Sequence, residues 1–259
     1  MPAILKLSKV VKRFGGLVAV NQVDLEVEKG SITSIIGPNG SGKTTLFNVI
    51  SGVLAPEEGN ILFQEREIAR LPAHKIARMG MARTFQNLQV FPSMTVIENV
   101  MMGAFRHHPS SLTAGGFWIT RSQRELKEMR EKASALLEKI GLAQWAEHKI
   151  EDIPFGIQRQ VEIIRALALE PNLLLLDEPA AGLSTKETIQ LTDFIGSLQN
   201  GSLTILLVEH DMSLVMQLAQ KIAVLNFGKK IAEGRPEEIR KNPAVIEAYL
   251  GKRGERNRG

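Results

Sequence analysis

The chain of 259 residues contains no cysteine, so disulfide bonds and thiolate metal sites are excluded. It also lacks long hydrophobic runs. Its most apolar stretches, 173–176 and 205–208, are far shorter than the roughly 20 residues of a membrane-spanning helix, and they are typical of buried strands. The N-terminal segment MPAILK is charged before any apolar run develops, which does not fit a secretory signal.

Aromatic residues make up only 5% of the chain and its basic residues are scattered, so we expect no binding to nucleic acid. The formal net charge of +4 suits a protein that works on nucleotides or near an anionic membrane surface, and it equally suits an ordinary protein with a basic tail. Part of the excess lies at 252–259, which we expect to be a flexible end. The hydrophobic fraction of 44% predicts a globular protein with a substantial core.

Hydrophobic periodicity predicts an α/β fold. Apolar residues alternate with polar ones at 4–10 and 23–27, which indicates half-buried strands of an antiparallel sheet. Further along, buried strands alternate with helices, which predicts a mainly parallel sheet with helices on both faces. The expected strands are 31–36, 173–176 and 204–208; the expected helices are 44–50, 157–170, 186–199 and 213–221; a hairpin at 222–232 and one final helix at 236–249 follow.

The middle of the chain, roughly 87–151, differs from this pattern. Between 122 and 140 it is rich in charged residues, while its apolar residues keep helical spacing. The segment 106–116 contains Pro, Ser and Gly and is expected to be a loop. Since no repeat or flexible linker divides the chain, we predict one domain in which a helical part is inserted into the α/β core.

A phosphate-binding loop is predicted at 37–44. The segment GPNGSGKT matches G-x-x-x-x-G-K-[ST] at every fixed position, and it lies between a predicted strand and a predicted helix. Glycines let backbone amides converge on phosphate oxygens, and the helix N-terminus adds the positive end of its dipole. Lys43 would supply charge to the β- and γ-phosphates, and the Thr44 hydroxyl would bind Mg²⁺. The predicted nucleotide-binding residues here are Gly37, Pro38, Asn39, Gly40, Ser41, Gly42, Lys43, Thr44 and Thr45.

Two acids end the apolar strand in the segment LLLLDEP, 173–179. Ligands of parallel sheets bind at the carboxyl ends of the strands. Asp177 is therefore expected to hold a metal ion, and Glu178 to polarise an attacking water as general base. An Asp-Glu-Pro sequence can also be a plain turn, an alternative that the phosphate-binding loop makes less favourable.

These motifs resemble those of the ABC ATPase family over nearly the whole chain. Gln86 in RTFQ matches the family's Q-loop glutamine, His210 in VEHD matches its switch histidine, and Phe14 matches its adenine-stacking aromatic. The resemblance implies ATP and Mg²⁺ as cofactors. It makes Glu178, His210 and Gln86 the catalytic residues and Thr44, Gln86 and Asp177 the metal ligands, and it adds Phe14 to the nucleotide site. For Phe14, a place in the core is the alternative.

The resemblance also implies a P-loop NTPase fold: a mainly parallel core sheet, an N-terminal antiparallel β-subdomain and an inserted α-helical subdomain. The whole chain, 1–259, would be one ABC ATPase domain. Residues 1–86 and 158–259 would form the α/β core with its antiparallel subdomain, and 87–157 the helical subdomain with the signature region.

Finer features are similar to the ATPases of branched-chain amino acid importers, namely the segments 82–86, 94–100, 178–183 and 232–251. They imply import of branched-chain or other neutral amino acids. The expected partners are two membrane-spanning permease subunits, a second ATPase subunit (a different chain, or an identical one) and, indirectly, a substrate-binding protein outside the membrane. The expected location is the cytoplasmic face of the membrane.

Other assignments stay open at this point. A transporter for urea or amides, a lipopolysaccharide-type exporter, and an ABC ATPase acting on ribosomes or DNA are alternatives, although no second ATPase unit or coiled-coil insert is visible. A kinase would leave Gln86 and His210 unexplained. A loop near Phe117 and Trp118 would either contact the membrane subunit or be a local packing anchor.

The signature motif departs from the family pattern. The usual Leu-Ser-Gly-Gly-Gln is replaced by IPFGI at 153–157, and Ser184 stands where the family often has aspartate. Pro154 offers neither a hydroxyl nor a backbone N–H, yet it suits a helix start, where the amides of Gly156 and Ile157 can face a phosphate. The resemblance implies two different ATPase chains, so we expect unequal sites in the pair, with the partner's site, which faces Pro154 and Ile157, the weaker. The alternative is that the helix terminus suffices and both sites work equally.

Overall fold

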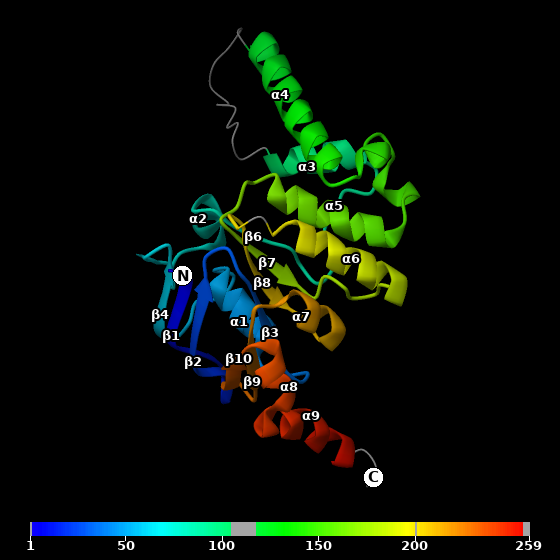
Figure 1. Cartoon of the computed structure of the whole chain (residues 1–259). Coiled ribbons are helices and arrows are strands. Elements are labelled where there is room, and N and C mark those ends of the chain that lie inside the picture. Colours follow the sequence, from blue (N-terminus) through cyan, green and yellow to red (C-terminus); the bar gives the residue numbers. More distant parts are fainter. Residues whose placement is uncertain (1, 105–117, 200, 256–259) are drawn as a thin grey trace.

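The computed structural model describes residues 2–104, 118–199 and 201–255, and its elements are arranged around two sheets (Figure 1). The predicted loop at 106–116 and the neighbouring Phe117 lie outside the described residues. The predicted flexible end begins inside the last helix, which continues to Glu255. Within the described ranges, no helix is long and apolar enough to cross a membrane.

The antiparallel sheet has the strand order β2-β1-β4-β5. Alternation in β1 buries Leu5 and Leu7 and exposes Lys6, as expected for a sheet with one face on the core. This confirms the predicted antiparallel strands, and it adds two strands that the sequence interpretation did not include. The four strands are β1 (Ala3–Phe14), β2 (Leu17–Glu28), β4 (Glu58–Phe63) and β5 (Arg66–Glu67).

The second sheet has six strands in the order β10-β9-β3-β8-β7-β6. All neighbours pair in parallel except the β9–β10 hairpin, which is antiparallel, so the mainly parallel core sheet is confirmed. Its strands are β3 (Ile32–Ile36), β6 (Met81–Arg83), β7 (Leu173–Asp177), β8 (Thr204–Val208), β9 (Lys221–Asn226) and β10 (Lys229–Gly234).

Strand β7, which lies between β8 and the edge strand β6, shows why this sheet forms a three-layer core. Successive side chains of a strand point to opposite faces. Leu173 and Leu175 pack with α1 and the antiparallel sheet, while Leu174 and Leu176 pack in the cluster that contains residues of α5 and α6. A continuous apolar run is therefore required in β7, because both of its faces are covered. These helices are α1 (Lys43–Ile50), α5 (Phe155–Leu167) and α6 (Thr185–Ser197).

The helical middle projects from one end of the molecule (Figure 1). Its helices are α3 (Val96–Ala104) and α4 (Trp118–Lys139), and α3 packs on both α4 and α5. Buried apolar residues of this part share one cluster with the face of the core sheet that α5 and α6 cover. They include Val96, Val100, Ala133 and Leu137. Helix α2 (Ala73–Arg78) leads into the edge strand β6. The boundaries 87–157 of the helical subdomain stay a prediction.

The predicted final helix at 236–249 is wrong, because the chain forms two helices there. They are α8 (Pro236–Lys241) and α9 (Pro243–Glu255), and they follow α7 (Met212–Leu218) and the hairpin. Asn242 lies between them with an extended backbone, φ −72° and ψ 120°. Pro243 excludes the helical conformation from the residue before it and lacks an N–H of its own, so the helix must restart there.

Candidate functional site

The phosphate-binding loop joins the central strand β3 to helix α1. Gly42 precedes the helix with φ 101°, a left-handed conformation, and a Cβ atom there would lie 2.3 Å from the carbonyl oxygen of Ala19. Only glycine fits this position without strain. The strand–loop–helix context that the motif requires is therefore present.

Lys43 and Thr44 occupy the first turn of α1. The Lys43 side chain is buried and curls back over the loop, where its Nζ donates to the carbonyl oxygens of Gly37 at 2.8 Å and Pro38 at 3.1 Å. Thr44 is exposed and Thr45 half-buried. Two carbonyl oxygens of the loop thus hold the charge of Lys43 against the loop.

Beside the loop is a hollow of about 340 Å³ that joins it to the first two strands and the β9–β10 turn. Phe14 ends β1 and is 47% exposed, which favours the stacking role over the alternative of a core residue. Phe227 and Leu17 are exposed in the same hollow, and the sequence analysis did not select them. The only local signal for Phe227 is its position in the hairpin turn, before Gly228.

Asp177 ends β7 and forms a buried ion pair. An Nη atom of Arg83 lies 2.7 Å from Oδ2 of Asp177, and the two side chains are only 8% and 3% exposed. The other Nη atom of Arg83 donates to Asn48 Oδ1 and Ser51 Oγ in and after α1. Arg83 therefore connects the helix of the phosphate-binding loop to the strand that carries the acids, a role that the sequence analysis missed.

The three predicted catalytic residues come together at the carboxyl ends of the strands. Gln86 Nε2 donates to Glu178 Oε2 at 3.1 Å, and His210 Nδ1 lies 3.7 Å from the same oxygen. Glu178 has a left-handed backbone, φ 46°, and its N–H donates to the carbonyl of Val208 at the end of β8. Six other non-glycine residues of the described chain also have a positive φ, so the convergence of the side chains, and not this conformation, distinguishes the site.

The predicted metal ligands fit Mg²⁺ in their chemistry. Thr44, Asp177 and Gln86 all offer oxygen atoms, the donors that this hard cation takes. In the described part of the chain, no three His, Cys, Asp or Glu side chains cluster as a metal cage. Few protein ligands, completed by substrate phosphates, are the usual arrangement for Mg²⁺.

The signature segment begins α5, and its amides have partners within the chain. The N–H of Gly156 donates to Glu187 Oε1 at 3.2 Å, and the N–H of Ile157 donates to the carbonyl of Pro154 at 2.9 Å. Glu187 and Ser184 form a capping box at the start of α6. In this structure the two amides are thus used locally, whereas the sequence predicted that they can face a phosphate. Ser184 acts as a helix cap.

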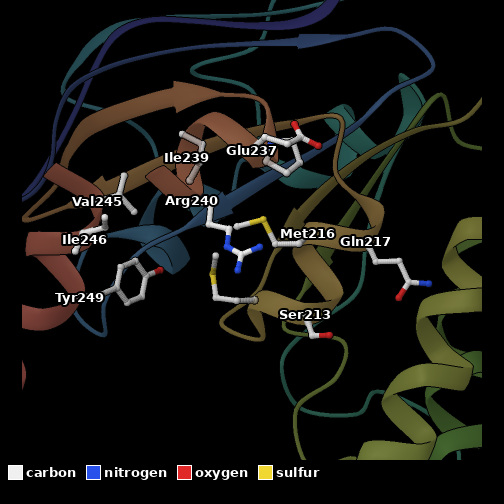
Figure 2. A pocket seen from close by; sticks show the side chains of 11 residues that line it. Ser213, Met216, Gln217, Glu237, Ile239, Arg240, Val245, Ile246 and Tyr249 are labelled. Atoms are coloured by element: carbon white, nitrogen blue, oxygen red, sulfur yellow. The ribbon is translucent and has the colours of Figure 1, made fainter. Parts of the chain in front are cut away.

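Another hollow, of about 1020 Å³, lies between α7, α8 and α9 and contains none of the predicted site residues (Figure 2). Met216, Ile239 and Tyr249 contribute its apolar wall, and the guanidinium of Arg240 points into the middle of the view. The large volume of this hollow therefore does not identify it as the nucleotide site, whose predicted residues lie at and near the phosphate-binding loop.

A glycine-rich loop between a central parallel strand and a helix, with an Asp–Glu pair ending a strand of the same sheet, defines a P-loop ATPase. The sequence profile of the ABC transporter family matches residues 20–181, and the profile described as "Branched-chain amino acid ATP-binding cassette transporter" matches residues 229–255. The chain therefore belongs to the ABC transporter family, as an ABC-type ATPase.

Similar proteins carry names that agree with this family. The high-affinity branched-chain amino acid transport ATP-binding protein BraF of Pseudomonas aeruginosa is 46% identical over 249 residues, which are 96% of this chain and 98% of BraF. LivG of Escherichia coli, with the same descriptive name, is 45% identical over 96% of this chain and 98% of its own.

Solved structures agree as well. The ADP conformation of MJ1267, an ATP-binding cassette of an ABC transporter, superposes with a TM-score of 0.84 at 32% identity and covers 97% of this chain and 100% of its own. A dimeric, post-hydrolysis ATP-binding cassette, MJ0796 bound to ADP and Pi, superposes with a TM-score of 0.73 at 26% identity, covering 90% of this chain and 98% of its own.

Proposed function

We propose that this chain hydrolyses Mg·ATP to drive an ABC importer of branched-chain or other neutral amino acids. The cargo is supported by the names of BraF and LivG and by the profile that matches the C-terminal part. The hydrolytic role of particular residues is supported above all by one observation: Gln86 and His210 converge on the carboxylate of Glu178.

In this proposal the phosphate-binding loop and Lys43 hold the triphosphate, and Phe14 stacks on the adenine. Glu178 accepts a proton from the attacking water, while Gln86 and His210 orient its carboxylate and face the γ-phosphate. Thr44, Asp177 and Gln86 would hold Mg²⁺, which would neutralise phosphate charge when bound. Such sites act mainly by positioning and charge stabilisation.

The proposed assembly contains two membrane-spanning permease subunits and a second ATPase subunit, which is a different chain or a second copy of this one. A substrate-binding protein outside the membrane would act indirectly, and this chain would lie at the cytoplasmic face. The dimeric cassette among the similar structures supports pairing of ATPase subunits. For a pair of different chains, we propose that the two sites are unequal, because Pro154 and Ile157 would face only the partner's nucleotide.

The test is Glu178→Gln in the full-length chain. The amide keeps the size of the side chain but cannot accept a proton, so ATP binding should persist while turnover falls about 10²–10⁴-fold. Steady-state phosphate release and equilibrium binding of ATP measure the two quantities. Glu151→Gln, which changes an exposed glutamate paired with Lys149, is the matched control.

Two results would contradict the proposal. One is an unaltered chain that neither binds nor hydrolyses Mg·ATP, alone or with its permeases. The other is a Glu178→Gln variant that turns over normally. Uptake of labelled leucine by vesicles with the reconstituted transporter tests the cargo, and uptake of urea in place of leucine would establish the alternative cargo.

A further inference from the structure

Glu209 is a buried carboxylate between two turns that carry the predicted catalytic residues. It follows the last residue of β8 and is 0% exposed. Its Oε1 accepts from the N–H of Ala180 at 2.8 Å, and its Oε2 accepts from the N–H groups of His210 at 2.9 Å and Asp211 at 3.3 Å. One side chain therefore satisfies three backbone donors.

These donors belong to two different turns. Ala180 lies two residues after Glu178, in the turn that leaves β7, whereas His210 and Asp211 lie between β8 and α7. Asp211 also caps α7 through its bond to the N–H of Ser213. Glu209 thus bonds the Glu178 turn to the His210 turn, in addition to the bond from the Glu178 N–H to the Val208 carbonyl.

Burial of the charged Glu209 carboxylate reduces the stability of the fold. Burial raises the pKa of Glu209, because the charged form loses its hydration, and the three amide bonds only partly offset this effect. The folded-state pKa lies above the unfolded one, so ionisation of Glu209 reduces stability as the pH rises through that interval. A neutral side chain would avoid this cost but would leave at least one of the three N–H donors without an acceptor.

We infer that Glu209 is a positioning residue for His210, which keeps the imidazole beside the Glu178 carboxylate by bonding the backbone of both turns. The inference rests on the proposed ATPase function and adds a residue that does not itself contact the nucleotide. A carboxylate is suited to this task because both of its oxygens accept hydrogen bonds and all three neighbours are donors. A glutamine would turn its NH₂ group toward one of these N–H groups.

The test is a double-mutant cycle on the full-length chain, with Glu209→Gln, His210→Ala and both changes together. In the unaltered background, Glu209→Gln should lower kcat about 10-fold or more, as expected for one lost hydrogen bond to a charged group. The KM for ATP should change less than about twofold, because the phosphate-binding loop is untouched. In the His210→Ala background, Glu209→Gln should lower kcat by less than about twofold, because its effect on the rate depends on His210.

Glu162→Gln is the matched control. Glu162 is another buried glutamate whose pKa is raised by burial, but it accepts from the N–H of Gln89 and pairs with Arg159. The factor by which Glu162→Gln lowers kcat should be the same with and without His210. Where steady-state rates with His210→Ala fall below detection, single-turnover hydrolysis of labelled ATP gives the same four rates.

Thermal unfolding separates the two effects: Glu209→Gln and Glu162→Gln both weaken buried hydrogen bonds and should both unfold at a lower temperature, but only Glu209→Gln should show a loss of kcat that depends on His210. Normal kcat for Glu209→Gln would overturn the inference, and so would an equal loss in both His210 backgrounds. Failure of the proposed function is a different result, namely no hydrolysis of Mg·ATP by the unaltered chain.

Discussion

The nucleotide half of the site consists of the phosphate-binding loop at 37–44 and the acids Asp177 and Glu178. It differs from the signature segment at 153–157 in whether contacts within this chain hold its side chains in place. In the nucleotide half, Lys43 and Asp177 are buried and bonded to neighbours within the chain. In the signature segment, Pro154 and Phe155 are exposed, and Glu187 is the side chain that bonds the start of α5. The first region is internally determined, whereas the second presents a surface whose role depends on what faces it.

The strongest test of this contrast is Arg83→Ala. Removing Arg83 leaves the buried Asp177 carboxylate without its ion pair, which should reduce the free energy of unfolding by about 3–5 kcal/mol. Chemical denaturation measures this quantity. The control is Arg13→Ala, since Arg13 pairs with Glu58 at a similar distance, 2.8 Å, but at the surface, where about 1 kcal/mol or less is expected. Equal losses from both changes would show that burial does not distinguish the nucleotide half.

A second test removes the charge that the phosphate-binding loop surrounds. Lys43→Ala should lower ATP turnover about 10²–10³-fold, because a preorganised donor to the developing phosphate charge is lost. Phosphate release by the assembled transporter measures it. Lys75→Ala, on the exposed surface of α2, is the control and should leave turnover unchanged. Turnover that survives Lys43→Ala would remove the nucleotide half from the chemistry.

The smallest effect is expected from restoring the signature. Pro154→Ser with Ile157→Gln should raise turnover of the ATPase pair roughly 2- to 10-fold, the equivalent of one recovered hydrogen bond at the partner's site. The measurement is turnover of the complex in which the partner's catalytic site is left intact and Glu178→Gln silences this chain's own. An unchanged rate would support the alternative that the helix terminus suffices.

Local motifs were enough to predict most of the nucleotide half. The loop at 37–44, the acids at 177 and 178 and the strands that flank them are contiguous patterns, so their geometry follows from a few neighbouring residues. Pro243 was an equally local signal, for the break between α8 and α9, and the expectation of one helix overlooked it.

The contacts that set these groups in place could not be predicted in the same way. Arg83 reaches Asp177 across 94 positions, Glu187 reaches Gly156 across 31, and Glu209 reaches Ala180 across 29. No periodicity or motif spacing records such pairs, because each depends on which strands or helices become neighbours in the folded chain. Phe227 entered the nucleotide hollow for the same reason.

By itself, the sequence predicted the chemistry of this protein: a glycine loop suited to binding phosphate, a strand buried on both faces, and acids at that strand's end. The tertiary structure decided which side chains hold these groups in place. The strand order β3-β8-β7-β6 brings Gln86, Glu178 and His210 together at the carboxyl ends of the strands. The physical reason is that backbone preference and hydrophobic period act over a few residues, whereas burial and charge pairing act between whatever surfaces the packed sheet brings together.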